Sequence, residues 1–131
     1  GSNFVKTMLR LSETRDALTV VADQIGGPTA AADIAAACLL IARRLKAGQT
    51  DGTYHFSGAP DVSWADFARE IFAQTNRDVA VSDITSAQYP TAAKRPGNSR
   101  MDCSSLKADF EIERPDWRQS LSMVLKDLKV I

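Results

Sequence analysis

The chain has few residues of the kinds that bind metals or form disulfides, and it has no long apolar segment. Its 131 residues include one histidine, His55, and two cysteines, Cys38 and Cys103, with no C-x-x-C spacing. We therefore expect no metal site, and two unpaired cysteines fit a reducing cytosol. The longest apolar run, Ile34–Ala42, has nine residues, whereas a membrane-spanning helix needs about 20. A soluble, cytoplasmic protein with no membrane partner is expected.

Charge of either sign is not in excess. Sixteen Lys and Arg residues balance sixteen Asp and Glu residues, which gives a formal net charge of zero. Proteins that bind nucleic acids or anionic membranes do so through Lys and Arg side chains that neutralise phosphates, and their usual signature is a positive excess, although a local basic patch can serve instead. The sequence therefore argues against a nucleic-acid partner.

The sequence also lacks the motifs of dinucleotide binding and of nucleophilic catalysis. No G-x-G-x-x-G loop and no G-x-S-x-G elbow occur. A short-chain dehydrogenase uses a tyrosine and a lysine four residues apart on a helix, where the ammonium group lowers the pKa of the phenol. Tyr54 has no such lysine, and Tyr89 and Lys94 are five residues apart with Pro90 between them. We expect no catalytic residue and no bound cofactor in this chain.

What the chain does contain is the composition and pattern of one α/β domain. It is 44% apolar and 24% charged, and a chain of this length buries roughly two thirds of its unfolded surface on folding. The β-branched run Ala17–Ala22 predicts a strand buried on both faces. Strands and helices alternate, as in α/β proteins. The expected strands are 17–22, 53–57 and 79–81, and the expected helices are 4–11, 29–47, 63–75, 104–110 and 117–128.

The helix starts carry recognisable caps. Thr29 supplies a hydroxyl that can cap the second helix, and Ser63 with Asp66 resembles a capping box at the start of the third. The large rings of Trp64 and Trp117, both at helix starts, are expected to fill the core. The apolar faces of the second and third helices consist of Ile34, Cys38, Ile41 and Leu45, and of Phe67, Ala68, Ile71 and Phe72.

Residues 3–131 are expected to form a single domain that comes from a longer protein. Gly1 and Ser2 are typical of the remnant of a cleaved expression tag. An amphipathic helix begins directly after them, at Phe4, with no starting methionine and no targeting signal before it. The sequence therefore looks like a piece cut from a longer chain.

Two loops carry residues that could bind an anion. The first, Asp23–Thr29, follows a predicted parallel strand and leads into a helix N-terminus, which is where open α/β sheets bind ligands. A plain turn followed by an N-cap would explain the same residues. The second, Lys94–Arg100, holds three cations, and a guanidinium there could bind a diphosphate through two hydrogen bonds. A solvent-exposed basic loop without a ligand is the alternative.

Four segments in a fixed order carry a family resemblance. They are Asn3–Leu9 (N-F-V-K-T-M-L), Val20–Thr29 with Asp33–Ala35 (V-V-A-D-Q-I-G-G-P-T…D-I-A), Tyr54–Gly58 with Ser63–Ala68, and Arg95–Ser99 with Asp116–Trp117. Together they resemble the bacterial dTDP-4-dehydrorhamnose reductases, which are members of the extended short-chain dehydrogenase superfamily. The resemblance covers nearly all of the chain.

The resemblance implies an α/β fold, namely the small C-terminal substrate-binding lobe of an extended short-chain dehydrogenase, with short parallel strands and flanking helices. It implies that an N-terminal Rossmann lobe, absent from this chain, is its partner and holds NADPH and the catalytic residues. The intact enzyme would reduce the C4 ketone of a dTDP-sugar, dTDP-4-dehydro-L-rhamnose, to dTDP-L-rhamnose, and a homodimer is compatible with this. The alternatives are a non-catalytic or regulatory relative, and a sister reductase or epimerase that acts on another nucleotide sugar.

By position, the resemblance also implies three groups of substrate-binding residues. Those at the N-terminus border the pocket, with an amide facing the substrate phosphates and an aromatic ring facing the core. Those of the first loop shape the wall under the nucleotide sugar, and those of the second loop meet the diphosphate or hold the closing loop. The three groups are Asn3 and Phe4; Asp23, Gln24 and Thr29; and Arg95 with Asn98 or Ser99.

Overall fold

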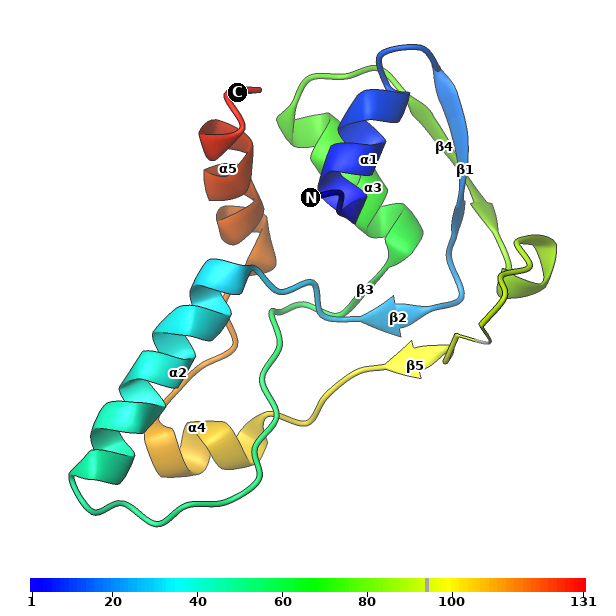
Figure 1. The fold of residues 1–131 in the computed structure, drawn as a ribbon. Helices are drawn as coiled ribbons and strands as arrows, with labels where there is room; N and C mark the ends of the chain where they lie inside the picture. The colour runs from blue at the N-terminus through cyan, green and yellow to red at the C-terminus, as the bar shows by residue number, and fades with distance from the viewer. Residues whose placement is uncertain (94) are drawn as a thin grey trace.

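The computed structural model describes residues 1–93 and 95–131, and Figure 1 shows their arrangement. The first helix, α1 (Phe4–Leu11), begins where the side chain of Asn3 accepts a hydrogen bond from the Lys6 N–H. It buries Val5, Met8 and Leu9, which lie three or four residues apart and therefore share one face. The predicted helix 4–11 is confirmed.

A two-stranded parallel sheet lies next to α1. Strand β1 (Ala17–Val21) pairs with β4 (Ala80–Ile84) in a register that places Ala17 opposite Ala80 and Val21 opposite Ile84. Burial alternates along β1, where Leu18 and Val20 are buried and Ala17 and Thr19 are exposed. The prediction of a strand buried on both faces was wrong, because the described core covers only one face of the sheet. The predicted strand 79–81 extends instead from 80 to 84.

Helix α3 (Trp64–Gln74) covers that sheet and forms the centre of the core. Ser63 caps it, as predicted: its hydroxyl accepts from the Asp66 N–H at 3.0 Å and donates to the Asp66 carboxylate at 2.8 Å. Trp117 is buried as expected. Trp64 does not fill the core, because it is 41% exposed. The buried face of the helix consists of Ala65, Ala68, Ile71 and Phe72, with Phe67 packed against it.

A second, three-stranded sheet passes under the core. Its middle strand is β2 (Ile25–Gly26), which pairs antiparallel with β3 (Val62–Ser63) and parallel with β5 (Asn98–Ser99). The segment 23–28, expected to be a plain loop, thus contains a strand. Each of these strands has only two residues, and so short a strand leaves no periodic pattern in the sequence.

Helix α5 (Trp117–Asp127) completes the core. The Asp116 side chain caps it by accepting from the Arg118 N–H, and Trp117, Leu121 and Leu125 are its buried residues. Its start is tied to the loop before β3, since the Trp117 indole donates to the Pro60 carbonyl at 2.8 Å. The connection between β4 and β5 contains one turn of 3-10 helix, η1 (Ser86–Gln88).

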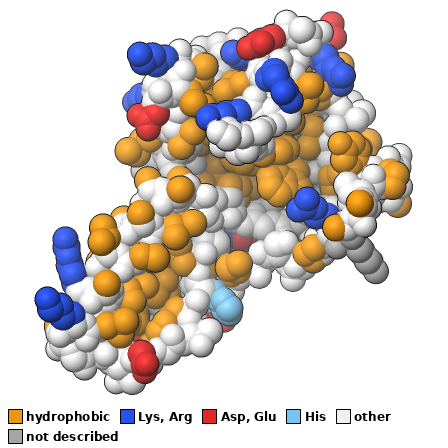
Figure 2. Space-filling model, in the orientation of Figure 1, with side chains coloured by type: hydrophobic (Ala, Val, Ile, Leu, Met, Phe, Trp, Pro, Cys, Tyr) orange, Lys and Arg blue, Asp and Glu red, His pale blue; other side chains and the backbone are white. Residues whose placement is uncertain are grey.

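Helices α2 (Ala31–Lys46) and α4 (Ser104–Phe110) lie apart from this core, at the lower left of Figure 1. Helix α4 was predicted with its observed bounds and buries Leu106 and Phe110. Helix α2 begins one residue later than a Thr29 cap would place it, because Ala30 is its N-cap. Ala37 is its buried residue. Its predicted apolar side is largely turned to solvent, because Ile34, Cys38 and Leu45 are exposed and Ile41 is half-buried. Figure 2 shows hydrophobic side chains at the surface in this part of the molecule.

The strand predicted at 53–57 is not formed. Burial alternates along the segment, with Tyr54 and Phe56 half-buried and Thr53 and His55 exposed, and Tyr54 packs edge-on against Phe110 at a ring distance of 5.1 Å. In residues 1–93 and 95–131, however, no backbone group pairs with residues 53–56. A strand needs such a ladder, which the side-chain pattern alone does not supply.

No helix among the described residues is long and apolar enough to cross a membrane.

Candidate functional site

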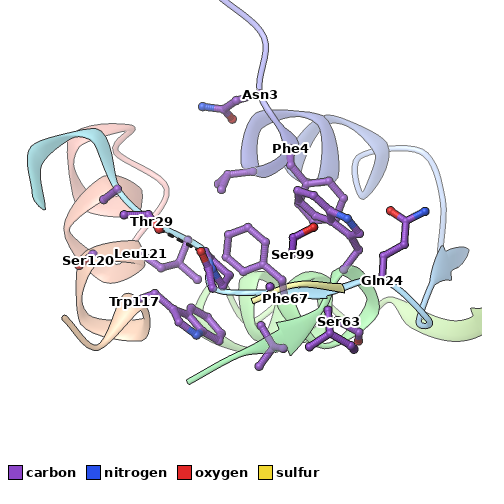
Figure 3. A pocket seen from close by; sticks show the side chains of 18 of the residues that line it. Asn3, Phe4, Gln24, Thr29, Ser63, Phe67, Ser99, Trp117, Ser120 and Leu121 are labelled. Atoms are coloured by element: carbon purple, nitrogen blue, oxygen red, sulfur yellow. Dashed lines mark hydrogen bonds between the residues drawn. The ribbon is translucent and has the colours of Figure 1, made fainter. Parts of the chain in front are cut away.

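A cavity of about 640 Å³ opens between the start of α1, the loop from β2 to α2, the start of α3 and the side of α5 (Figure 3). Each wall is positioned by the fold. The Asn3 cap fixes the N-terminal end of α1, the Ser63 cap fixes the start of α3, and the pairing of β2 fixes the loop that leads to α2. The principal polar and aromatic lining residues are Asn3, Phe4, Gln24, Thr29, Ser63, Trp64, Phe67, Ser99, Trp117 and Ser120.

Aromatic rings form the floor of the cavity. Phe4 lies 4.8 Å from Trp64 and 5.5 Å from Phe67, measured between ring centroids, and Phe67 meets Trp117 edge-on at 5.3 Å. Figure 3 shows the rings of Phe4, Phe67 and Trp117 pointing into the space between α1, α3 and α5. The half-exposed face of Trp64 offers a flat apolar surface to a ligand. Sequence reasoning missed Trp64, whose position in the first turn, directly after the Ser63 cap, was the available signal.

Amides and hydroxyls surround this floor. The Gln24 amide donates to the Ser86 hydroxyl at 2.9 Å. The Thr29 hydroxyl donates to the Gly27 carbonyl at 2.9 Å and accepts from the Gly58 N–H at 3.0 Å. It therefore holds the wall of the cavity and does not cap α2. Groups of this kind can bind and orient a ligand by hydrogen bonds, while the rings beside them supply apolar contact.

Asp23 lies outside the lining of the cavity. Its carboxylate accepts two hydrogen bonds from the Ser86 N–H at 2.9 Å and one from the Ser86 hydroxyl at 2.7 Å. These bonds, led by the one from the hydroxyl, lower the pKa of Asp23 below its ordinary value. Asp23 and Gln24 together thus tie the end of β1 to η1. That arrangement holds a loop; it does not point a carboxylate at a ligand.

Among the described residues of the second loop, Ser99 alone lines the cavity. Asn98 pairs with Ile25 across the sheet and accepts from the Arg100 N–H at 3.1 Å. Arg95 is exposed and lies outside the lining, and among the described residues it makes no ion pair. Lys94, the first cation of this loop, lies outside the described residues.

The structure therefore brings together residues from all three predicted groups. Asn3, Phe4, Gln24, Thr29 and Ser99 line one cavity, although they come from segments far apart in the sequence. Asp23, Arg95 and Asn98 stay outside it. In the described ranges, no three His, Cys, Asp or Glu side chains are grouped so that they could hold a metal ion.

Comparison with known proteins gives three consistent results. The sequence matches the RmlD substrate binding domain over residues 1–130. It is 49% identical to a dTDP-4-dehydrorhamnose reductase from Sinorhizobium fredii, over 92% of the chain and 43% of that relative. Among solved structures it is similar to two dTDP-4-dehydrorhamnose reductases, one from Clostridium acetobutylicum (TM-score 0.91, 37% identity) and one from Bacillus anthracis in complex with NADP (TM-score 0.84, 35% identity). These matches include 98% and 97% of this chain, but only 45% and 44% of the two solved chains, so this chain spans less than half the length of either.

Proposed function

The chain belongs to the RmlD substrate binding domain family, and from this membership we propose that it is the substrate-binding part of an NADPH-dependent dTDP-4-dehydrorhamnose reductase. The proposed reaction transfers a hydride to the C4 ketone of dTDP-4-dehydro-L-rhamnose and gives dTDP-L-rhamnose. In the intact enzyme, NADPH supplies that hydride from a Rossmann lobe. The residues described above bind and orient the sugar.

The observation that carries this proposal is the meeting of Asn3, Phe4, Gln24, Thr29 and Ser99 around one cavity. Its volume is in the range of about 300–1,000 Å³ that small-molecule sites occupy. A nucleotide-linked deoxysugar has a flat base and an apolar methyl group, which suit an aromatic floor, and hydroxyl and phosphate oxygens, which suit an amide and hydroxyl rim. The cavity offers both kinds of surface.

The glycines of the first loop do not fit the cofactor. A side chain added at Gly27 would place its Cβ 2.2 Å from the Gly58 carbonyl oxygen, and one added at Gly26 would lie 3.3 Å from Ser99. Their missing side chains make room for neighbouring protein segments. A dinucleotide loop instead uses glycine to let its backbone approach a pyrophosphate. We therefore assign no step in this chain to NADPH.

Each predicted site residue, inside or outside the cavity lining, has a proposed role. The side-chain oxygen of Asn3, Oδ1, already accepts from the Lys6 N–H at 2.9 Å, so the side-chain NH₂ group is the part that donates to substrate phosphates. Gln24 and Thr29 form the wall under the sugar, and Asp23 holds that wall through Ser86. Arg95, with Ser99 or Asn98, meets the diphosphate when the second loop closes. A bidentate guanidinium is suited to that task.

Ligand titrations of the 131-residue chain test whether it binds the nucleotide sugar and not the cofactor. We expect dTDP-L-rhamnose to shift backbone amide resonances of the lining residues in ¹H–¹⁵N spectra, with weak affinity because part of the pocket wall lies in the other lobe. NADPH should shift none of them, and the chain should not oxidise NADPH in the presence of a dTDP-ketosugar. UDP-glucose serves as the control for base and sugar preference. Saturable NADPH binding, or equal shifts with UDP-glucose, would contradict the proposal.

Arg95 is the residue to test in the intact reductase. Arg95→Ala should raise the KM for the dTDP-sugar far more than that for NADPH, because losing a charge-assisted partner of a diphosphate costs about 1.5 to 3 kcal/mol. Arg95→Lys should recover little, since lysine lacks the planar fork. Arg10→Ala, at an exposed position in α1, is the matched control. Unchanged sugar kinetics with a lower melting temperature would make Arg95 a structural loop residue and move the contact to Lys94 or Arg100.

A further inference from the structure

The cavity wall Gly27–Thr29 is held from behind by a second segment, Ser57–Ala59. The Gly58 N–H donates to the Thr29 hydroxyl at 3.0 Å, and that hydroxyl donates in turn to the Gly27 carbonyl at 2.9 Å. The two segments approach so closely that a Cβ on Gly58 would lie 2.1 Å from the Pro28 carbonyl oxygen. Any movement of the second segment must therefore move the wall.

One arginine fixes the second segment. The Arg114 guanidinium donates through Nη2 to the Gly58 carbonyl at 2.6 Å and through Nε to the Ser57 carbonyl at 3.3 Å. Its Nη2 also meets Asp61 Oδ1 at 2.5 Å. A single planar group thus joins two backbone carbonyls and a carboxylate, which is a geometry that lysine cannot reproduce.

The Arg114–Asp61 pair is more sheltered than the other ion pairs. The two side chains are 26% and 23% exposed, whereas every other ion pair between described residues has at least one partner more than 40% exposed. Exposed ion pairs contribute little to stability. Removing one partner of a sheltered pair costs more stability, because it leaves a sheltered charge without its counterpart. Neither residue lines the cavity, so neither is placed to touch a ligand.

We propose that Arg114 and Asp61 are positioning residues for the substrate cavity: they hold Ser57 and Gly58 so that the Gly58 N–H fixes the Thr29 hydroxyl and, with it, the wall Gly27–Thr29. The ligand in this proposal is the nucleotide sugar of the proposed function, on which it rests. The pair acts through Thr29 and sets affinity without contacting the sugar.

The test compares variants of the 131-residue chain by two measurements, the Kd for dTDP-L-rhamnose from NMR titration and the hydrogen-exchange rate of the Gly58 amide without ligand. We expect Arg114→Ala to raise the Kd about tenfold and to speed Gly58 exchange by a similar factor. Arg114→Lys should recover less than half of either effect on a logarithmic scale. Asp61→Asn, which keeps an acceptor for Arg114, should have the smallest effect.

Two controls separate positioning from general stability. Ile71→Val lowers stability from the buried core, and should lower the melting temperature while leaving both the Kd and the Gly58 exchange rate nearly unchanged at a temperature well below unfolding. Arg44→Ala removes the exposed pair with Glu111, 2.8 Å long, and should change neither quantity.

The outcomes distinguish a positioning role for Arg114 and Asp61 from a purely structural one. If Arg114→Ala raises the Kd and the exchange rate no more than Ile71→Val does at an equal loss of melting temperature, the pair is merely structural and the proposal is overturned. If Arg114→Ala does not fold, Arg114→Lys gives the same comparison, since lysine lacks the planar fork and should still raise both the Kd and the exchange rate. If the unaltered chain binds no dTDP-L-rhamnose, the proposed function fails, yet Gly58 exchange still decides whether Arg114 positions the wall.

Discussion

Replacing Ile71 by alanine is expected to lower the free energy of unfolding by about 2 to 5 kcal/mol. Ile71 has no exposed surface, and it lies in the middle of the cluster that joins α1, β1, α3 and α5. Truncation removes three carbon atoms from a closely packed interior, and the surrounding helices can close the resulting cavity only in part. Urea unfolding followed by circular dichroism at 222 nm would measure the loss.

The same substitution on the surface is the control for Ile71. Ile34 lies in α2 and is 45% exposed, so Ile34→Ala removes the same atoms from a position that is open to water. Its effect should stay within about 0.5 kcal/mol, partly because alanine favours a helix more than isoleucine does. Equal losses for the two variants would show that the buried cluster is not the source of stability.

Gly58→Ala is expected to destabilise the chain by about 3 kcal/mol or more, at or beyond the upper end of ordinary overpacking. The new Cβ would lie 2.1 Å from the Pro28 carbonyl oxygen and 3.1 Å from the Trp117 Cβ. The nearest atom belongs to backbone, so no side-chain rotation can relieve the contact. The wall Pro28–Thr29 must move, and binding of dTDP-L-rhamnose should weaken together with stability.

Gly97→Ala is the matched control for Gly58. A Cβ there would lie 3.4 Å from the Asp23 carbonyl oxygen, which is close to ordinary van der Waals contact. This variant should keep its melting temperature within about 2 °C of that of the unaltered chain. A melting temperature for Gly58→Ala that is equally close would mean that the two segments are not in contact as described.

The helices were predictable from the sequence because their signals are local. In α3, the Ser63 hydroxyl and the spacing of Ala68 and Ile71 define the start and the buried face, and both lie within one short window. Helix α4 was predicted with its observed bounds for the same reason. The sequence could also point to cavity residues such as Asn3 and Thr29, since they lie in segments that resemble a known family.

The strands and the rest of the cavity depend on contacts between distant segments. Strand β2 exists because Ile25 pairs with both Ser63 and Asn98. No pattern in the sequence near Ile25 indicates either partner. The segment at Tyr54 shows the converse, because its alternating pattern finds no ladder among the described residues. Trp64 lines the cavity beside Phe4 of α1 and stays 41% exposed there, and this too is a property of the folded chain.

Helix α2 is held to the rest of the molecule by little packing, so its stability differs from that of the core. Ala37 is its buried residue, and its ties to the rest of the described chain include the hydrogen bond from the Ser120 hydroxyl to Asp33 at 2.6 Å and the exposed pair of Arg44 with Glu111. A 16-residue helix with so little packing draws most of its stability from its own backbone, and isolated helices of that length are marginal in water. We therefore expect α2 to unfold as a separate unit and to open first on heating, while the cluster around Ile71 stays intact.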